Sequence, residues 1–389
     1  MRRLCFFIFL VLCGCKGKVH SDNNHAFSGT VEFIPSEKVF ISESVDSIVY
    51  LKLENSDSAF ISRIHKVRFK NDKIFIGDFS QNKIIVYDTS GTFLYALNKR
   101  GRGPEEYLEI KSYCVDSSNV YVVDNMKRKL HIYDSRNGKF LKNRDLPFVA
   151  WDMEVLGEDA FVFCFSPFYK GGLKYEQPNY KLFVTDTNLH IINQYFPYTE
   201  DDFDLIGKDT YFTLNGDDVI YNWCMSDECY VISPAKPDCL DTIHFDFGDK
   251  KIPKSLKQNK QVLESDEYRY MDGTPVFTGN YIAMEISEGD YCDCYLYDRQ
   301  TKQVLKNSLN SSFNCLLYPD GTDTQGRFVY ILRNKEIYDE LVADGFIKAS
   351  VEIEQHLEDG LAIVFYIMNA HEIKNINMYE TQWQKYISS

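Results

Sequence analysis

The segment KIFIGD at residues 73–78 is followed by KIIVYD at 83–88, and the pair returns 46 residues later as NVYVVD at 119–124 and KLHIYD at 129–134. In both copies a polar turn separates the two segments, and a turn containing glycine follows the second one. Runs of β-branched and aromatic residues bounded by such turns are typical of antiparallel strands. The spacing therefore predicts a repeated unit of β-strands joined by short turns.

A repeat of about 40–50 residues built from such strands is typical of the blades of a β-propeller. One blade cannot cover both of its faces, so neighbouring blades must stack around an axis. Less regular copies follow the first two along the chain. They fall at 160–186, 219–247, 280–309 and 326–367.

The two ends of the repeated region carry extra features. Segments 335–344 and 350–357 within the last copy have helix-like composition, and we expect them to be small helical insertions. The strand at 47–53 has no blade of its own, and joining it to the last blade leaves no sheet edge open at the junction. The predicted fold is all-β: a six-bladed β-propeller of four-stranded antiparallel blades over residues 45–389, closed by this N-terminal strand.

Asp88 and Asp134 end the second strand of each quoted pair and stand directly before a turn. Aspartate in that position commonly accepts hydrogen bonds from the backbone of the turn. We therefore expect both residues to cap their turns rather than to bind a ligand.

The connection that leaves the first full repeat reads KRGRGPEEY at 99–107. Gly101 and Gly103 permit backbone angles closed to other residues, and Pro104 fixes one dihedral angle, so the loop is expected to turn sharply. Glu106 is placed to accept hydrogen bonds from loop amides, and Tyr107 to pack beneath the loop. Gly101, Gly103, Pro104 and Tyr107 are thus interpreted as structural.

With its flanking strands, this loop resembles the NHL-type repeat. It is more similar still to a family of six-bladed β-propeller lipoproteins of Gram-negative anaerobic bacteria, which pair a Gly-x-Gly-Pro-x-Glu-Tyr loop with a lipid-accepting cysteine. That resemblance implies a fold and a place in the cell envelope, and it implies no activity.

Five residues are candidates for ligand binding. Loops of this connection type lie on the propeller face where ligands usually bind, and a tryptophan starts the next inner strand near the same mouth. The candidates are Arg100, Arg102, Glu105, Glu106 and Trp151.

The first 15 residues read as an export signal. Two arginines precede a run of about nine apolar residues, which is far shorter than the roughly 20 needed to span a bilayer. The run LCGC at 12–15 resembles the bacterial lipobox, and that resemblance implies removal of residues 1–14 and fatty acylation (palmitate) of Cys15. Residues 15–44 would then form the lipidated N-terminus and a linker. Lys16 favours the outer membrane by the same resemblance, with the side of that membrane left open.

The composition and the contexts of single residues exclude some classes of partner and site. The net charge of −14 argues against nucleic acid as a partner. The cysteine contexts predict buried thiols at Cys114 and Cys164, because both lie in apolar strands. The alternation along 129–134 places His131 on a sheet surface rather than in a metal site.

Three functions remain in view, and one of them is a purely structural role inside an assembly. The leading hypothesis is an envelope-anchored binding or scaffold module for a glycan, a peptide or a partner protein, without metal or cofactor. The alternative is a metal-dependent hydrolase or lyase whose site lies in the propeller channel. The sequence contains no local catalytic motif such as His-Glu-x-x-His or Gly-x-Ser-x-Gly, which favours the non-enzymatic function.

Overall fold

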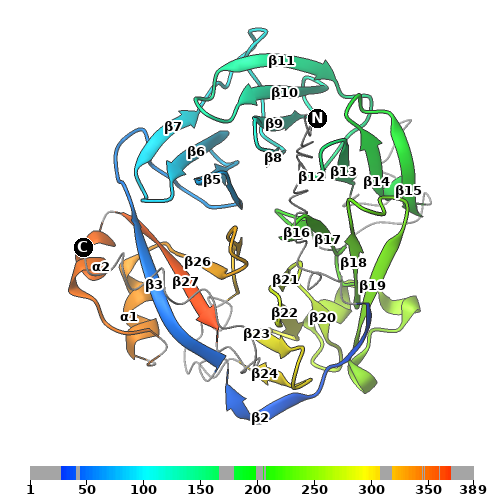
Figure 1. The fold of residues 1–389 in the computed structure, drawn as a ribbon. Helices are drawn as coiled ribbons and strands as arrows, with labels where there is room; N and C mark the ends of the chain where they lie inside the picture. Colours follow the sequence, from blue (N-terminus) through cyan, green and yellow to red (C-terminus); the bar gives the residue numbers. More distant parts are fainter. Residues whose placement is uncertain are drawn as a thin grey trace, which may run out of the picture.

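The computed structural model describes residues 28–40, 44–165, 179–198, 205, 207–306, 318–343, 345, 347–358 and 360–368. Within them, six β-sheets stand side by side around a central axis and form a closed ring (Figure 1). This confirms the predicted six-bladed β-propeller. The export signal and Cys15 lie outside the described residues.

The first three blades each use four consecutive strands, ordered from the axis outwards (Figure 1). Blade 1 contains β4 (Lys66–Lys70), β5 (Lys73–Asp78), β6 (Lys83–Asp88) and β7 (Phe93–Leu97). Blade 2 contains β8 (Ser112–Val115), β9 (Asn119–Asp124), β10 (Lys129–Asp134) and β11 (Phe140–Asp145). Blade 3 contains β12 (Asp152–Leu156), β13 (Ala160–Cys164), β14 (Tyr180–Asp186) and β15 (Ile191–Pro197).

The other three blades carry additions. Blade 4 contains β16 (Phe212–Asn215), β17 (Asp218–Tyr221), β18 (Glu228–Ile232) and β19 (Leu240–Asp246), so it begins before residue 219, where the repeat predicted it. Three short 3-10 helices, η2 (Gly248–Lys250), η3 (Lys254–Leu256) and η4 (Lys260–Glu264), lead to blade 5. Blade 5 contains β20 (Tyr270–Met271), β21 (Val276–Phe277), β22 (Tyr281–Glu288), β23 (Tyr291–Asp298) and β24 (Val304–Lys306).

Blade 6 closes the ring with strands from both ends of the chain. It contains β25 (Gly321–Thr322), β26 (Phe328–Leu332), β27 (Leu361–Met368) and the N-terminal β3 (Val45–Leu53). β3 pairs antiparallel with β27, as predicted for the closing strand. The predicted helical insertions are also present between β26 and β27, as α1 (Lys335–Ala343) and α2 (Val351–His356). Neither helix is long and apolar enough to cross a membrane, and the same holds for every helix in the described part of the chain.

Part of the segment predicted to be a linker is instead folded onto the ring. β1 (Gly29–Glu32) pairs in parallel with β19, and β2 (Pro35–Phe40) pairs in parallel with β24. Val31 is fully buried, and the Phe33 ring lies 4.8 Å from that of Tyr295, so apolar side chains hold this stretch on blades 4 and 5. The segment 15–44, predicted to be the lipidated N-terminus and linker, therefore contains the strands Gly29–Glu32 and Pro35–Phe40.

The hydrophobic core lies between blades. Each of the six interfaces between neighbouring blades holds its own cluster of buried side chains in the described structure. Cys114 and Cys164 are buried in two of them as free thiols, which confirms their predicted packing. His131 is also buried, between the Tyr107 and Tyr133 rings, because the sheet face on which it lies is covered.

The repeated aspartates act on the backbone as expected. Asp88 accepts hydrogen bonds from the amides of Ser90 and Thr92, and Asp134 accepts one from the amide of Arg136. Asp78 and Asp124, at the ends of β5 and β9, are fully buried and each bind two backbone segments. Asp78 and Asp124 therefore connect strand ends to loops on one face of the ring, and Asp88 and Asp134 cap turns on the opposite face.

Candidate functional site: the mouth of the propeller axis

A network of charged side chains fills the axis on the side of blades 1 to 4. Its upper layer comes from the first residues of three innermost strands, Lys66 of β4, Ser112 of β8 and Asp152 of β12. Lys66 Nζ lies 2.7 Å from Asp152 Oδ1, and Ser112 Oγ donates to the same oxygen at 2.5 Å. The other carboxylate oxygen of Asp152 accepts from the amides of Tyr211 and Phe212 at the start of blade 4. One carboxylate therefore joins four blades.

A second layer lies two residues further along the same strands, because alternate residues of a strand share a face. Arg68 Nε donates to Glu154 Oε1 at 2.8 Å, and Lys66 Nζ lies 2.6 Å from that oxygen. Arg68 also donates to the Phe212 carbonyl oxygen of blade 4. The two cations and two carboxylates balance, and their side chains are at most 9% exposed.

Burial and pairing act in opposite directions on this network. Burial by itself raises the pKa of Asp152, but Lys66 and the hydrogen bonds from Lys66 and Ser112 leave that pKa below its ordinary value. The carboxylate is therefore held ionised although it is out of contact with water. Blades 5 and 6 are joined to blade 4 by neutral hydrogen bonds, from Thr213 to the Pro275 carbonyl and from Thr322 to the Leu214 carbonyl.

Above the network, residues that precede the innermost strands of blades 1 to 3 form the mouth of the axis. They are His65 before β4, Lys111 before β8 and Trp151 before β12, all partly exposed, whereas the equivalent Tyr211 before β16 is buried. The Lys111 ammonium lies 3.6 Å from the centroid of the Trp151 ring, a cation–π contact. Burial lowers the pKa of Lys111, and burial also lowers the pKa of His65.

Acidic side chains complete the mouth. Glu109 lies two residues before Lys111. Burial raises the pKa of Glu109, and the charge of the nearby Asp124 raises it to a smaller extent. Asp209 pairs with Arg63 at 2.7 Å, across the connections that enter blades 4 and 1. The mouth thus presents an indole, cations and carboxylates on the face where blades connect.

The loop at 99–107 is held together by its own side chains. Glu106 Oε2 accepts a hydrogen bond from the Gly103 amide at 2.7 Å, and Tyr107 is fully buried, as expected. Neither Gly101 nor Gly103 has a positive φ, so the predicted reason for these glycines is wrong. A Cβ atom at Gly101 would lie 2.0 Å from the Glu106 carboxylate, so that side chain would have to move.

The structure separates the predicted ligand-binding residues. The loop carbonyls of Pro104 and Glu105 accept hydrogen bonds from Asn143 of β11 and Tyr133 of β10, so the loop lies over the outer half of blade 2. Trp151 instead adjoins the innermost strand of blade 3. Arg100, Arg102 and Glu105 are exposed, Glu106 closes the loop, and ligand binding by this set stays a prediction.

The network residues and Lys111 were missed from the sequence. The 46-residue repeat carries a signal for them, because it aligns His65 with Lys111 and Lys66 with Ser112. It does not show that strands from different blades meet at one axis. Within the described residues, no three His, Cys, Asp or Glu side chains are grouped to hold a metal ion.

The fold and this site define the class: a six-bladed β-propeller with a filled, charge-balanced axis under a polar mouth. Residues 33–359 match the family described as "Domain of unknown function (DUF4934)", and the chain belongs to that family. No curated protein sequence matches the chain significantly.

Two solved structures share the fold. A protein from Bacteroides fragilis, provisionally named as exported, is similar with a TM-score of 0.71 and 18% identity; the match covers 88% of this chain and 100% of that one. A member of the DUF4221 family from Bacteroides vulgatus is similar with a TM-score of 0.50 and 9% identity, covering 84% and 97%. At these identities the likeness establishes the fold alone.

Proposed function

We propose that this protein is a lipid-anchored propeller of the bacterial cell envelope that binds a glycan, a peptide or a partner protein at the mouth of its axis. The observation that carries the proposal is the set of polar side chains at equivalent strand positions, above all the Lys111–Trp151 pair. An indole with a cation over its ring combines an apolar side chain with hydrogen-bond donors. Sugar rings and peptide groups both use that combination.

The charge balance beneath the mouth favours binding over catalysis. A hydrolase or lyase in the channel needs carboxylates free to bind a metal or move a proton. Asp152 and Glu154 are instead committed to Lys66 and Arg68, at distances of 2.6 to 2.8 Å.

The binding proposal is tested by capture. The tagged protein is incubated with solubilised envelope proteins and, separately, on an array of oligosaccharides. We expect Trp151→Ala and Lys111→Ala to lose what the unmodified protein retains, and Tyr291→Ala, which removes an aromatic side chain that is 77% exposed on blade 5, to keep it. Equal capture by all four proteins would contradict a binding site at the mouth.

The anchor is tested separately, because its residues lie outside the described structure. Support comes from the lipobox-like run at 12–15, and, for the location, from the similar protein that is named as exported. Cells grown with a labelled fatty acid are expected to label the unmodified protein and not the Cys15→Ala variant. Label that persists in the variant would refute anchoring through Cys15.

A further inference from the structure

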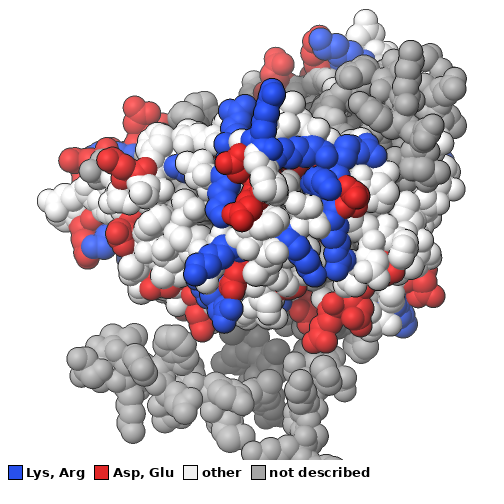
Figure 2. Space-filling model, turned by 90° about the horizontal axis from the view of Figure 1, so that it is seen from above, with Lys and Arg blue, Asp and Glu red and all other residues white. Residues whose placement is uncertain are grey.

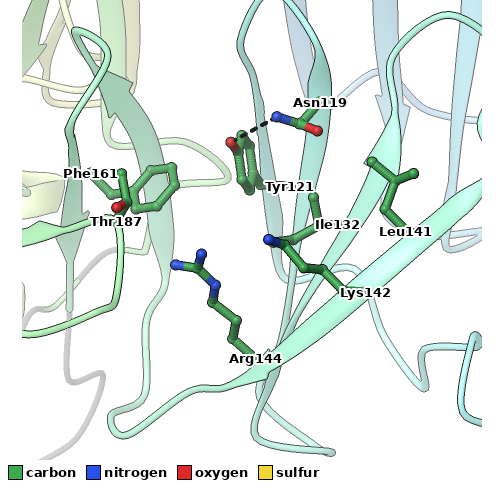
Figure 3. A pocket seen from close by; sticks show the side chains of 8 residues that line it. All are labelled: Asn119, Tyr121, Ile132, Leu141, Lys142, Arg144, Phe161 and Thr187. Carbon is green, nitrogen blue, oxygen red and sulfur yellow. Dashed lines mark hydrogen bonds between the residues drawn. The ribbon is translucent and has the colours of Figure 1, made fainter.

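A pocket of about 270 Å³ opens at the rim of the ring, between blades 2 and 3 (Figure 3). It is built from β9, β10 and β11 on one side and from blade 3 on the other. Its lining residues are Asn119, Tyr121, Ile132, Leu141, Lys142, Arg144, Phe161 and Thr187.

Two cations of β11 form one wall of this pocket. Lys142 and Arg144 are alternate residues of the strand and point to the same side (Figure 3), whereas the intervening Asn143 bonds to Pro104 on the other side. Neither cation has an ion-pair partner among the described residues. Nearby Lys129 and Arg136 do have one, in Asp145 and Asp134.

The rest of the pocket is suited to shielding an anion. Tyr121 and Phe161 pack edge to face with ring centroids 4.9 Å apart and form an apolar floor. The Tyr121 hydroxyl is already used, since it donates to Asp116 and accepts from Asn119. An acid that enters beside Lys142 and Arg144 would therefore meet charge on one wall and apolar surface below.

The whole of blade 2 is basic in an acidic protein. From residue 98 to residue 145 there are eleven Lys and Arg against seven Asp and Glu, while the chain as a whole carries −14. Figure 2, seen from above the view of Figure 1, shows Lys and Arg side chains gathered on the outer side of the ring where β10 and β11 lie. Long-range attraction therefore favours an anionic partner at this rim.

β11 is also an open sheet edge, because it pairs with β10 and with no other described strand. Blades 4 and 5 show how this fold fills such an edge: β1 and β2 add in parallel to the outer strands β19 and β24. The outer strands of blades 1 and 3, β7 and β15, have no lysine or arginine. Among blades 1 to 3, blade 2 is thus the one whose described residues combine an open edge with cations that have no ion-pair partner.

We propose that β11 accepts an extended acidic peptide segment of a partner protein as a fifth strand, with one Asp or Glu side chain in the pocket beside Lys142 and Arg144. Backbone hydrogen bonds to the edge give affinity, and the carboxylate, bound by the guanidinium and the ammonium, gives selectivity. A sugar acid would use the cations but not the edge, so the open edge favours a peptide.

The test uses the full chain and a fluorescent nine-residue peptide in which Glu alternates with Thr and Val, followed by anisotropy. We expect Arg144→Gln and Lys142→Gln each to weaken binding by about 10- to 100-fold, the loss typical of a charge-assisted hydrogen bond. Lys139→Gln is the matched control, because Lys139 is exposed just before β11 and does not line the pocket. All three variants should keep the unfolding midpoint of the parent protein.

Two further probes separate the alternatives. A peptide with Gln in place of Glu should not bind, and binding by this peptide would exclude carboxylate recognition. A peptide N-methylated at alternate amides should not bind either, and binding by this peptide would exclude strand addition. Binding of a glucuronate oligosaccharide, with no binding of the acidic peptide, would overturn the proposal in favour of an acidic sugar. The peptide and the Lys142 and Arg144 variants test this site alone, and the capture experiment with the Lys111 variant tests the mouth, so failure of one proposal does not decide the other.

Discussion

At the scale of single residues, Asp152 is the side chain that connects four blades at the axis. It accepts from Lys66, Ser112 and two amides of blade 4, and it is 1% exposed. A buried ion pair adds little net stability compared with apolar residues, but removal of one partner leaves an uncompensated buried charge. The network is therefore sensitive to any single neutralising change.

We expect Asp152→Asn to lower the free energy of unfolding by about 3–5 kcal/mol, because it leaves the axis with two cations and one carboxylate. Asp145→Asn is the control: this residue pairs with Lys129 at the surface and is 90% exposed, so its loss should cost less than about 1 kcal/mol. Urea unfolding followed by tryptophan fluorescence measures both. Similar costs for the two variants would show that the axial network does not act as a buried unit.

The same carboxylate makes stability depend on pH. Burial raises and pairing lowers the pKa of Asp152, with a net value below the ordinary 3.8, so the folded protein binds this proton less readily than the unfolded chain. The stability that ionised Asp152 contributes is complete above the pKa that this residue has in the unfolded chain. It is lost as the pH falls through the lower pKa that the residue has in the folded protein. The urea midpoint of unfolding, measured from pH 7 to pH 3, should decrease once the pH drops below about 4. This decrease should be steeper for the parent protein than for Asp152→Asn. Parallel profiles for the two proteins would contradict this assignment.

At the scale of elements, the loop at 99–107 shows how a side chain can determine a backbone position. Glu106 closes the loop over Gly101, while Lys127 donates to the carbonyls of Gly103 and Glu106 from the next blade. The loop is thereby part of the contact between blades 1 and 2.

Gly101→Ala should cost about 1–2 kcal/mol, because the Glu106 carboxylate must move away from the added Cβ atom and gives up its hydrogen bond from the Gly103 amide. Gly279→Ala is the comparison, because a Cβ atom at Gly279 would meet no other atom within 4 Å and the residue has no positive φ, so it should cost no stability. Adding Glu106→Ala to Gly101→Ala should add little further loss, because that hydrogen bond is already broken. Additive losses in thermal unfolding would argue against this contact.

The N-terminal strand β1 offers a second element-scale test. Val31 is fully buried between blades 4 and 5, whereas Ile34 is 72% exposed three residues later. Val31→Ala should lower stability by about 2 kcal/mol, and Ile34→Ala should have almost no effect. Equal, small effects in urea unfolding would mean that this stretch contributes nothing to the folded ring.

At the scale of the whole molecule, ring closure depends on β3, which covers the edge of β27 along its length. A chain that starts at residue 45 lacks β1 and β2 but keeps this closure, and it should remain a monomer of lower stability. A chain that starts at residue 54 exposes the β27 edge, including Ile363 and Phe365, and should aggregate. Size-exclusion chromatography distinguishes the two, and a monomeric, folded chain from residue 54 would show that closure is dispensable.

The sequence by itself determined the architecture of this protein. Strand patterns and turns are local, and the 46-residue spacing repeats them, so six blades, the closing strand and the capping roles of Asp88 and Asp134 followed from neighbouring residues. The tertiary structure alone decided the sites. Lys66, Asp152 and the mouth residues lie on different blades, and the pocket of Lys142 and Arg144 exists only where blade 3 stands against blade 2. Ring closure brings together residues that are 40 to 86 positions apart in the sequence. A local sequence pattern does not indicate which of these distant residues will be in contact.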